Sequence, residues 1–141
     1  MQRCYPRKKR ICRSEWPYQL AGIGLLGCML ELPVEAIIAQ DYGITKGYFA
    51  ENFTAQEFVS SGVSKLYAWK ERNSEIEFLR VLDGEIVPVE VKSGQRTQAK
   101  SLQQYQKKYA PQSAIIISGK TLNRDHTKVV KNYPLYMAGS I

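Results

Sequence analysis

Two glutamates and a lysine are spaced so that they could carry out hydrolytic chemistry. Glu77 and Glu90 lie on two short runs, 75–82 and 85–92, in which apolar and polar residues alternate. Like charges that face each other across paired strands are destabilising unless something offsets the repulsion. A shared divalent cation would do so, and carboxylate oxygens favour hard ions such as Mg²⁺ or Mn²⁺. Lys92 lies on the same strand face as Glu90 and could orient or help deprotonate an attacking water, which indicates metal-assisted phosphodiester hydrolysis.

A hairpin turn at Asp83-Gly84 would position these side chains. Asp-Gly between two alternating runs predicts a two-residue type I′ turn, because both central positions need positive φ. The register that follows pairs Leu82 with Glu85, Val81 with Ile86, Leu79 with Pro88, Glu77 with Glu90 and Glu75 with Lys92. One face of the hairpin then forms the core, with Ile76, Phe78, Arg80, Leu82, Val87, Val89 and Val91. An alternative needs no metal: Glu75 and Glu77 form exposed salt bridges with Lys92, worth about 0–1 kcal/mol.

The elements around the hairpin predict an α/β (α+β) domain. We expect helices at 18–30, 33–40, 45–61 and 98–109, and further strands at 66–71, 113–118 and 132–136. The isoleucine-rich strand is typical of burial on both faces, and the helix before it predicts a crossover into a parallel strand. Glu51 lies on a helix with apolar residues on several sides, so we expect a buried carboxylate that needs a partner.

Charge and cysteine content limit the functional classes. The chain of 141 residues has a net charge of +7, but six of its 20 Lys and Arg residues lie in 1–13. Residues 14–141 hold 14 basic and 13 acidic residues, so the body is nearly neutral. We expect residues 1–17 to be a basic, disordered segment and 18–141 to be a single domain. Three cysteines without CxxC spacing and a single histidine give no zinc, Ser-His-Asp or Cys-His site.

Two short motifs resemble functions that we do not expect. Residues 118–121, SGKT, end like a phosphate-binding loop, but Ala114 stands where that loop needs its first glycine. We therefore expect no ATP site. The apolar stretch 20–28 ends in Cys28 like a lipoprotein export signal, but Pro17 interrupts its approach and the stretch is short. We expect a core helix there, no membrane association and a cytoplasmic protein, with export as the alternative.

Together these segments resemble a known family. Glu51, Glu77 and Glu90-Val91-Lys92, in helix–strand–strand order, resemble the PD-(D/E)XK, restriction-endonuclease-like fold. More closely, residues 48–58 (YFAENFTAQEF), 66–79, 85–94 and 101–109 resemble the uncharacterised C-terminal domain behind the ATPase module of many prokaryotic AAA-type ATP-binding proteins. The resemblance implies a central mixed β-sheet flanked by helices. It also implies that the four charged residues named above, Glu51, Glu77, Glu90 and Lys92, converge on one site.

The function implied by this resemblance is that of a metal-dependent nuclease-like domain that binds or cleaves DNA. Glu77 and Glu90 would hold Mg²⁺ or Mn²⁺, Lys92 would position water and Glu51 would support the site. Position 77 usually carries Asp in both families, and Ala21 stands where the AAA-associated domain commonly has Asp. The alternative is a catalytically inactive nuclease-fold module for assembly or partner binding. An ATPase partner or a missing ATPase module, and a homodimer, follow by analogy, and Gln103 or Gln104 would face the same cleft.

Overall fold

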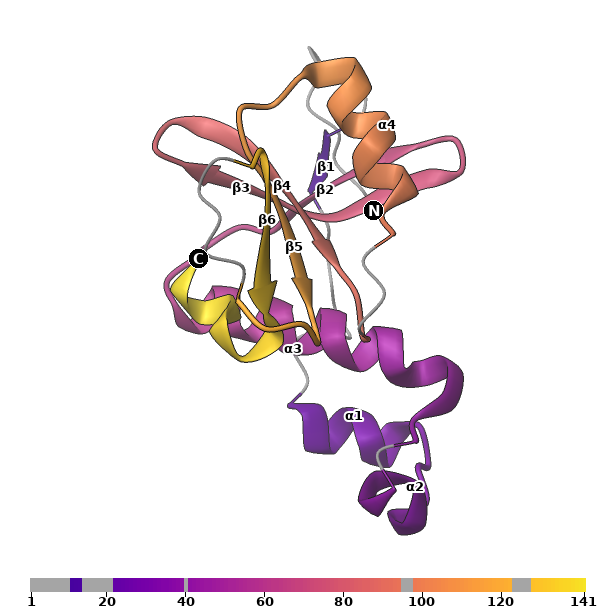
Figure 1. The fold of residues 1–141 in the computed structure, drawn as a ribbon. Coiled ribbons are helices and arrows are strands. Elements are labelled where there is room, and N and C mark those ends of the chain that lie inside the picture. Colours follow the sequence, from indigo (N-terminus) through magenta and orange to yellow (C-terminus); the bar gives the residue numbers. More distant parts are fainter. Residues whose placement is uncertain (1–10, 14–21, 40, 95–97, 123–127) are drawn as a thin grey trace.

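A mixed β-sheet lies between helices on its two faces (Figure 1). This computed structural model describes residues 11–13, 22–39, 41–94, 98–122 and 128–141. Helix α3 (Lys46–Ser60) and the 3-10 helix η2 (Leu135–Ser140) cover one face, and α4 (Lys100–Tyr109) covers the other. The expected α/β (α+β) class with a central mixed sheet flanked by helices is therefore confirmed.

The strands lie in the sheet in the order in which they occur in the chain. They are β1 (Ile11–Arg13), β2 (Tyr67–Glu71), β3 (Ser74–Leu82), β4 (Glu85–Val91), β5 (Ala114–Ser118) and β6 (Val130–Pro134). Strands β1 to β4 are antiparallel, whereas β4, β5 and β6 run parallel. Helix α4 makes the crossover between β4 and β5, and every residue of β5 is buried, as predicted. Strand β1 falls within the segment 1–17, whose other residues lie outside those that the structure describes.

The turn between β3 and β4 has the predicted conformation. Asp83 and Gly84 have φ of 51° and 81°, and the pairs from Leu82–Glu85 to Phe78–Val89 follow the predicted register. Positive φ at both central residues matches the right-handed twist of the two strands. Glu77 and Glu90 thus lie at the open end of the hairpin, away from the turn.

Two hydrophobic clusters fix the helices to the sheet. Under α3, the Phe58 and Phe78 rings meet edge to face with centroids 5.4 Å apart. Under α4, the Trp69 and Tyr105 rings do the same at 5.3 Å. Ile76 packs in the cluster under α4, so the prediction that it shares a face with Phe78 is wrong. An irregularity in β3, described below, causes this change of face.

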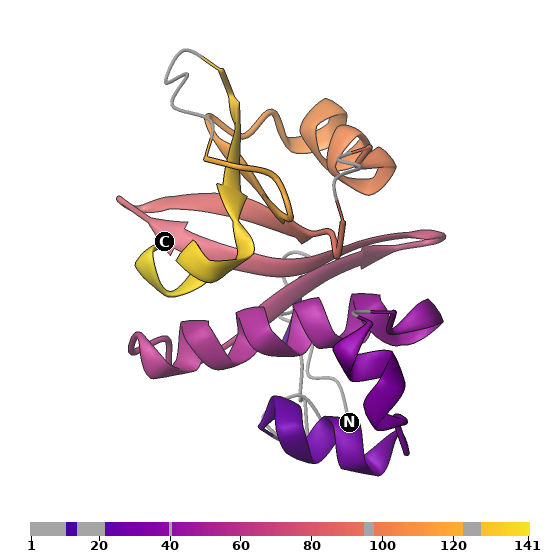
Figure 2. The same ribbon diagram turned by 60° about the horizontal axis from the view of Figure 1, so that its bottom comes forward.

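Helices α1 (Ile23–Met29) and α2 (Val34–Ile38) lie on the side of α3 that faces away from the sheet (Figure 2). They are shorter than expected; residues 18–21 and 40, which we expected to be helical, lie outside the described part of the chain. The 3-10 helix η1 (Gly43–Thr45) leads from α2 into α3. Neither α1 nor α2 contains a buried residue, and Cys28 is an exposed free thiol, so the prediction of a core helix here is wrong. Among the described residues, no helix is long and apolar enough to cross a membrane.

Candidate functional site

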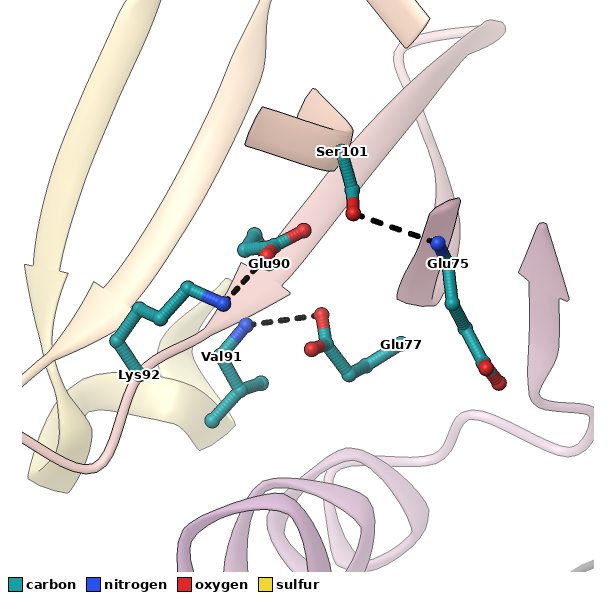
Figure 3. A network of polar contacts seen from close by, with 6 residues as sticks. All are labelled: Glu75, Glu77, Glu90, Val91, Lys92 and Ser101. Carbon is teal, nitrogen blue, oxygen red and sulfur yellow. Dashed lines mark hydrogen bonds and ion pairs between the residues drawn. The ribbon is translucent and has the colours of Figure 1, made fainter. Parts of the chain in front are cut away.

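Strands β3 and β4 stop pairing beside the acidic residues. Their last backbone pair is Phe78–Val89. Beyond it, the Val91 N–H donates a hydrogen bond of 3.2 Å to the Glu77 carboxylate (Figure 3). The Lys92 N–H donates at 2.8 Å to a carbonyl oxygen of β5. The regular ladder expected at this end of the hairpin is therefore interrupted, and β4 passes from its antiparallel neighbour to its parallel one.

A bulge in β3 redirects Glu77. Tyr67 pairs with Leu79 and Trp69 with Ile76, so three steps along β3 match two steps along β2. The extra residue changes which face the following side chains occupy, and bulges of this kind often redirect a side chain next to a functional site. As a result the Glu77 carboxylate reaches the amide of β4 that would otherwise join the ladder.

Glu90 is the most deeply buried of the acidic residues at the site, with 2% of its surface exposed. Its Oε1 accepts a hydrogen bond from Lys92 Nζ at 2.5 Å. Its Oε2 is buried and accepts no hydrogen bond from an amide, hydroxyl or ammonium group of the described residues; a further hydrogen bond of this side chain is with the Glu77 carboxyl. Because an unpaired buried carboxylate oxygen is costly, this atom calls for a proton or a cation.

The two carboxyl groups share this need. Burial and, next, the negative charge of Glu90 raise the pKa of Glu77 to about 8; hydrogen bonds from the backbone of Glu77 and Val91 and the charge of Lys92 oppose the increase only in part. Burial also raises the pKa of Glu90, while the hydrogen bond and charge of Lys92 and a hydrogen bond with the Glu77 carboxyl act in the opposite direction. In the absence of a cation, the pair therefore retains a proton near neutral pH.

Lys92 and Glu51 belong to the same electrostatic cluster. Burial lowers the pKa of Lys92, but the hydrogen bond and charge of Glu90, with the charges of Glu77 and Glu51, outweigh it and leave the pKa raised. Burial on α3 raises the pKa of Glu51; Glu75 and Glu90 add to the increase and Lys92 counters it. Lys92, an ammonium group, thus lies within electrostatic reach of Glu51, Glu77 and Glu90.

Glu75 has a different partner from the one expected. Its carboxylate forms an exposed ion pair with Lys70 on β2, at 3.0 Å. Its N–H donates to Ser101 Oγ at the start of α4, at 3.3 Å (Figure 3). Both the predicted Glu75–Lys92 pair and the alternative of exposed salt bridges to Lys92 are therefore wrong, because Lys92 pairs with buried Glu90. The sequence signal that was missed is the tight turn after Glu71, which sets Lys70 opposite Glu75.

One glutamine of α4 contacts Ser74 at the start of β3. Both Gln103 and Gln104 are exposed, and Gln104 Oε1 accepts a hydrogen bond from the Ser74 hydroxyl. This contact joins α4 to the start of β3. It gives no support to the expectation that a glutamine faces the cleft.

The acidic pair fits a divalent cation that takes few protein ligands. Within the described residues, no group of three or more His, Cys, Asp or Glu side chains is arranged to hold a metal ion. Mg²⁺, however, is commonly bound through one or two carboxylates, with water and substrate phosphate completing its coordination. The buried Glu90 and Glu77 carboxyl groups, which are hydrogen-bonded to each other in the absence of an ion, match that need.

Fold and site together define an α/β domain with a buried carboxylate pair and a lysine where the sheet changes from antiparallel to parallel pairing. The chain belongs to the family described as Domain of unknown function (DUF4143), whose model matches residues 46–137. The family is often found in AAA-ATPase-associated proteins, in agreement with the expected likeness. The chain matches no curated protein and no solved structure. The matched region contains all four charged residues and begins after α1 and α2.

Proposed function

We propose that this chain is a nuclease-like domain of the PD-(D/E)XK type, which acts on DNA in the cytoplasm with Mg²⁺ or Mn²⁺. The observation that carries the proposal is a buried pair of carboxyl groups: Glu90 Oε2 accepts no amide, hydroxyl or ammonium donor among the described residues, and the carboxyl that Glu90 hydrogen-bonds, Glu77, has a raised pKa. In a purely structural role, such an arrangement would be unfavourable. In a cation site, the same two carboxylates become ligands.

The residues of the site have separate roles in this proposal. Glu77 and Glu90 hold the cation, which when bound supplies Lewis acidity to a phosphoryl oxygen. Lys92, as an ammonium group, donates hydrogen bonds, so it orients the attacking water and stabilises developing negative charge rather than removing a proton. Glu51 supports the site as a ligand or as an acceptor for water from the side of α3.

Exposed basic residues on the elements that border β3 support DNA as the substrate. Arg72 lies in the β2–β3 turn, and Lys100 and Lys107 are exposed on α4, which contacts β3 next to that turn. Such side chains can contact phosphates without reading sequence. Lys70 and Lys108 already form ion pairs with acidic residues. They therefore contribute less positive charge to a DNA-binding surface than unpaired lysines would.

The second candidate function is an inactive nuclease-fold module for assembly or partner binding, including binding to an ATPase. It is favoured by one observation: a Glu77 oxygen accepts the Val91 N–H, so part of the longer side chain serves the backbone. Asp, the usual residue of the resembled families, is one methylene shorter.

The two candidates are separated by a cleavage assay. We would incubate plasmid, linear and branched DNA with and without Mn²⁺, using the wild-type chain, Glu90→Gln, Lys92→Met and the control Glu85→Gln. Glu85 is exposed on the same strand at the hairpin turn. The nuclease proposal predicts Mn²⁺-dependent cleavage by wild type and the control only. No cleavage by wild type on any DNA would contradict it and favour the binding module.

A further inference from the structure

Eight large apolar side chains stay exposed between the start of α1 and the first turn of α3. We call them the α1–α2 surface; they are Leu25, Met29, Leu30, Val34, Ile37, Ile38, Ile44 and Tyr48. Their exposed fractions reach 77% at Ile38 and 95% at Ile44. Soluble monomers rarely leave this much apolar surface in contact with water unless it is an interaction site.

The helices that carry this surface gain little stability from burial within the described chain. Helix α1 has seven residues and α2 has five, and neither contains a buried residue. Helices this short are marginal in water unless an apolar face is covered. A Cβ at Gly24 or Gly27 would meet no atom of the described residues outside α1 within 4 Å, so these two positions of the helix are open. A partner that covers the α1–α2 surface would supply the missing burial.

Charge decides against two kinds of partner. Residues 22–45 contain three acidic residues, Glu31, Glu35 and Asp41, and no Lys or Arg. Both DNA phosphates and anionic lipid headgroups would be repelled, because their binding depends on basic side chains. The face therefore fits a protein surface that is also apolar. Interfaces between identical chains are the most apolar class, with few charges at their centre.

The area agrees with a dimer. The eight exposed fractions together equal about five fully exposed side chains, or roughly 750 Å² at about 150 Å² each. A standard interface buries about 800 Å² on each partner. We propose that the α1–α2 surface is the dimer interface of this chain, formed by the same surface of a second copy about a two-fold axis. The interface thus lies on the helical layer and not at a sheet edge.

Light scattering after size exclusion tests this proposal on the full chain. The variant is Ile38→Glu, and the matched control is Val81→Glu, an apolar residue of β3 with 67% exposure that lies outside the surface. At about 100 µM, an interface of micromolar affinity is largely occupied. We expect a dimer for wild type and Val81→Glu and a monomer for Ile38→Glu.

Alkylation of Cys28 gives a second readout that does not depend on a variant. Cys28 is an exposed thiol on α1. Dimer formation would cover α1, so the alkylation rate of Cys28 in the wild-type chain, measured by peptide mass spectrometry, should fall as protein concentration rises. A monomeric wild type would overturn the proposal. So would a dimer that persists in Ile38→Glu, together with a Cys28 alkylation rate in wild type that does not change with protein concentration.

Discussion

Replacing Glu77 with glutamine should stabilise the metal-free chain at alkaline pH and have little effect in acid. The folded state keeps a proton on Glu77 up to a pKa of about 8, whereas the unfolded chain releases it near the ordinary value of 4.5. Between these values the unfolded state binds fewer protons, so the free energy of unfolding of wild type falls as pH rises. Glutamine resembles the protonated acid: its oxygen can accept the Val91 N–H while its amide donates to Glu90 Oε2.

The magnitude follows from the width of this interval. Each pH unit over which only the folded state keeps the proton is worth about 1.4 kcal/mol, which sets a ceiling of about 5 kcal/mol. Glu90 takes part in the same titration and the site can relax, so we expect about 2–3 kcal/mol. The quantity to compare is the free energy of unfolding of Glu77→Gln minus that of wild type.

Urea unfolding followed by circular dichroism, with chelator present, measures this difference at about pH 5 and about pH 8.5. We expect it to grow with pH, and we expect Glu85→Gln, in the control position on β4, to show no such growth. A constant difference, or a loss of stability on substitution at the higher pH, would refute the view that the acidic pair is under strain without a cation.

Three further substitutions test the supporting structure by the same unfolding measurement. Lys92→Met should destabilise the chain by about 2 kcal/mol near neutral pH, because Glu90 loses its buried donor. The destabilisation should become smaller in acid as Glu90 becomes protonated. A destabilisation that does not depend on pH would contradict the role of Lys92 as the donor to Glu90. Phe58→Ala should cost about 3–5 kcal/mol, because the fully buried ring packs against the sheet and lies under the Arg80 guanidinium; a cost below about 1 kcal/mol would mean that α3 packs differently. Gly84→Ala should lower the free energy of unfolding by about 1 kcal/mol, because alanine is strained at the φ of 81° that Gly84 adopts. An unchanged free energy of unfolding would contradict the turn geometry.

Local signals were sufficient to predict the hairpin and its neighbours. Asp83-Gly84 determines both the turn and the register, because the turn needs positive φ at two residues and the side chains alternate with period two. The parallel arrangement of β5 followed from its isoleucine-rich sequence and the helix before it. The convergence of Glu51 with Glu77, Glu90 and Lys92 was implied by resemblance and stays a prediction; against the effect of burial, the charges of all three glutamates raise the pKa of Lys92.

Features that depend on contacts between distant segments could not be predicted in the same way. The bulge near Glu77 arises from the match of β3 to β2, and a period-two pattern contains no sign of an extra residue. The exposure of α1 and α2 depends on what covers them, and an apolar sequence looks the same whether its partner is its own core or another molecule. The Lys70–Glu75 pair, in contrast, follows from the tight turn after Glu71, a local signal that was missed.

The most direct test of the central claim is a calorimetric titration of Mn²⁺ into the wild-type chain at about pH 7.5, in buffers of different ionisation enthalpy. The acidic pair should bind one ion in a saturable manner and release protons, because the pKa of Glu77 lies near 8 before the ion binds. Binding should be lost in Glu77→Gln and Glu90→Gln and retained in Glu85→Gln. If wild type does not bind Mn²⁺, or if Glu90→Gln binds it equally well, the acidic pair is not a metal centre.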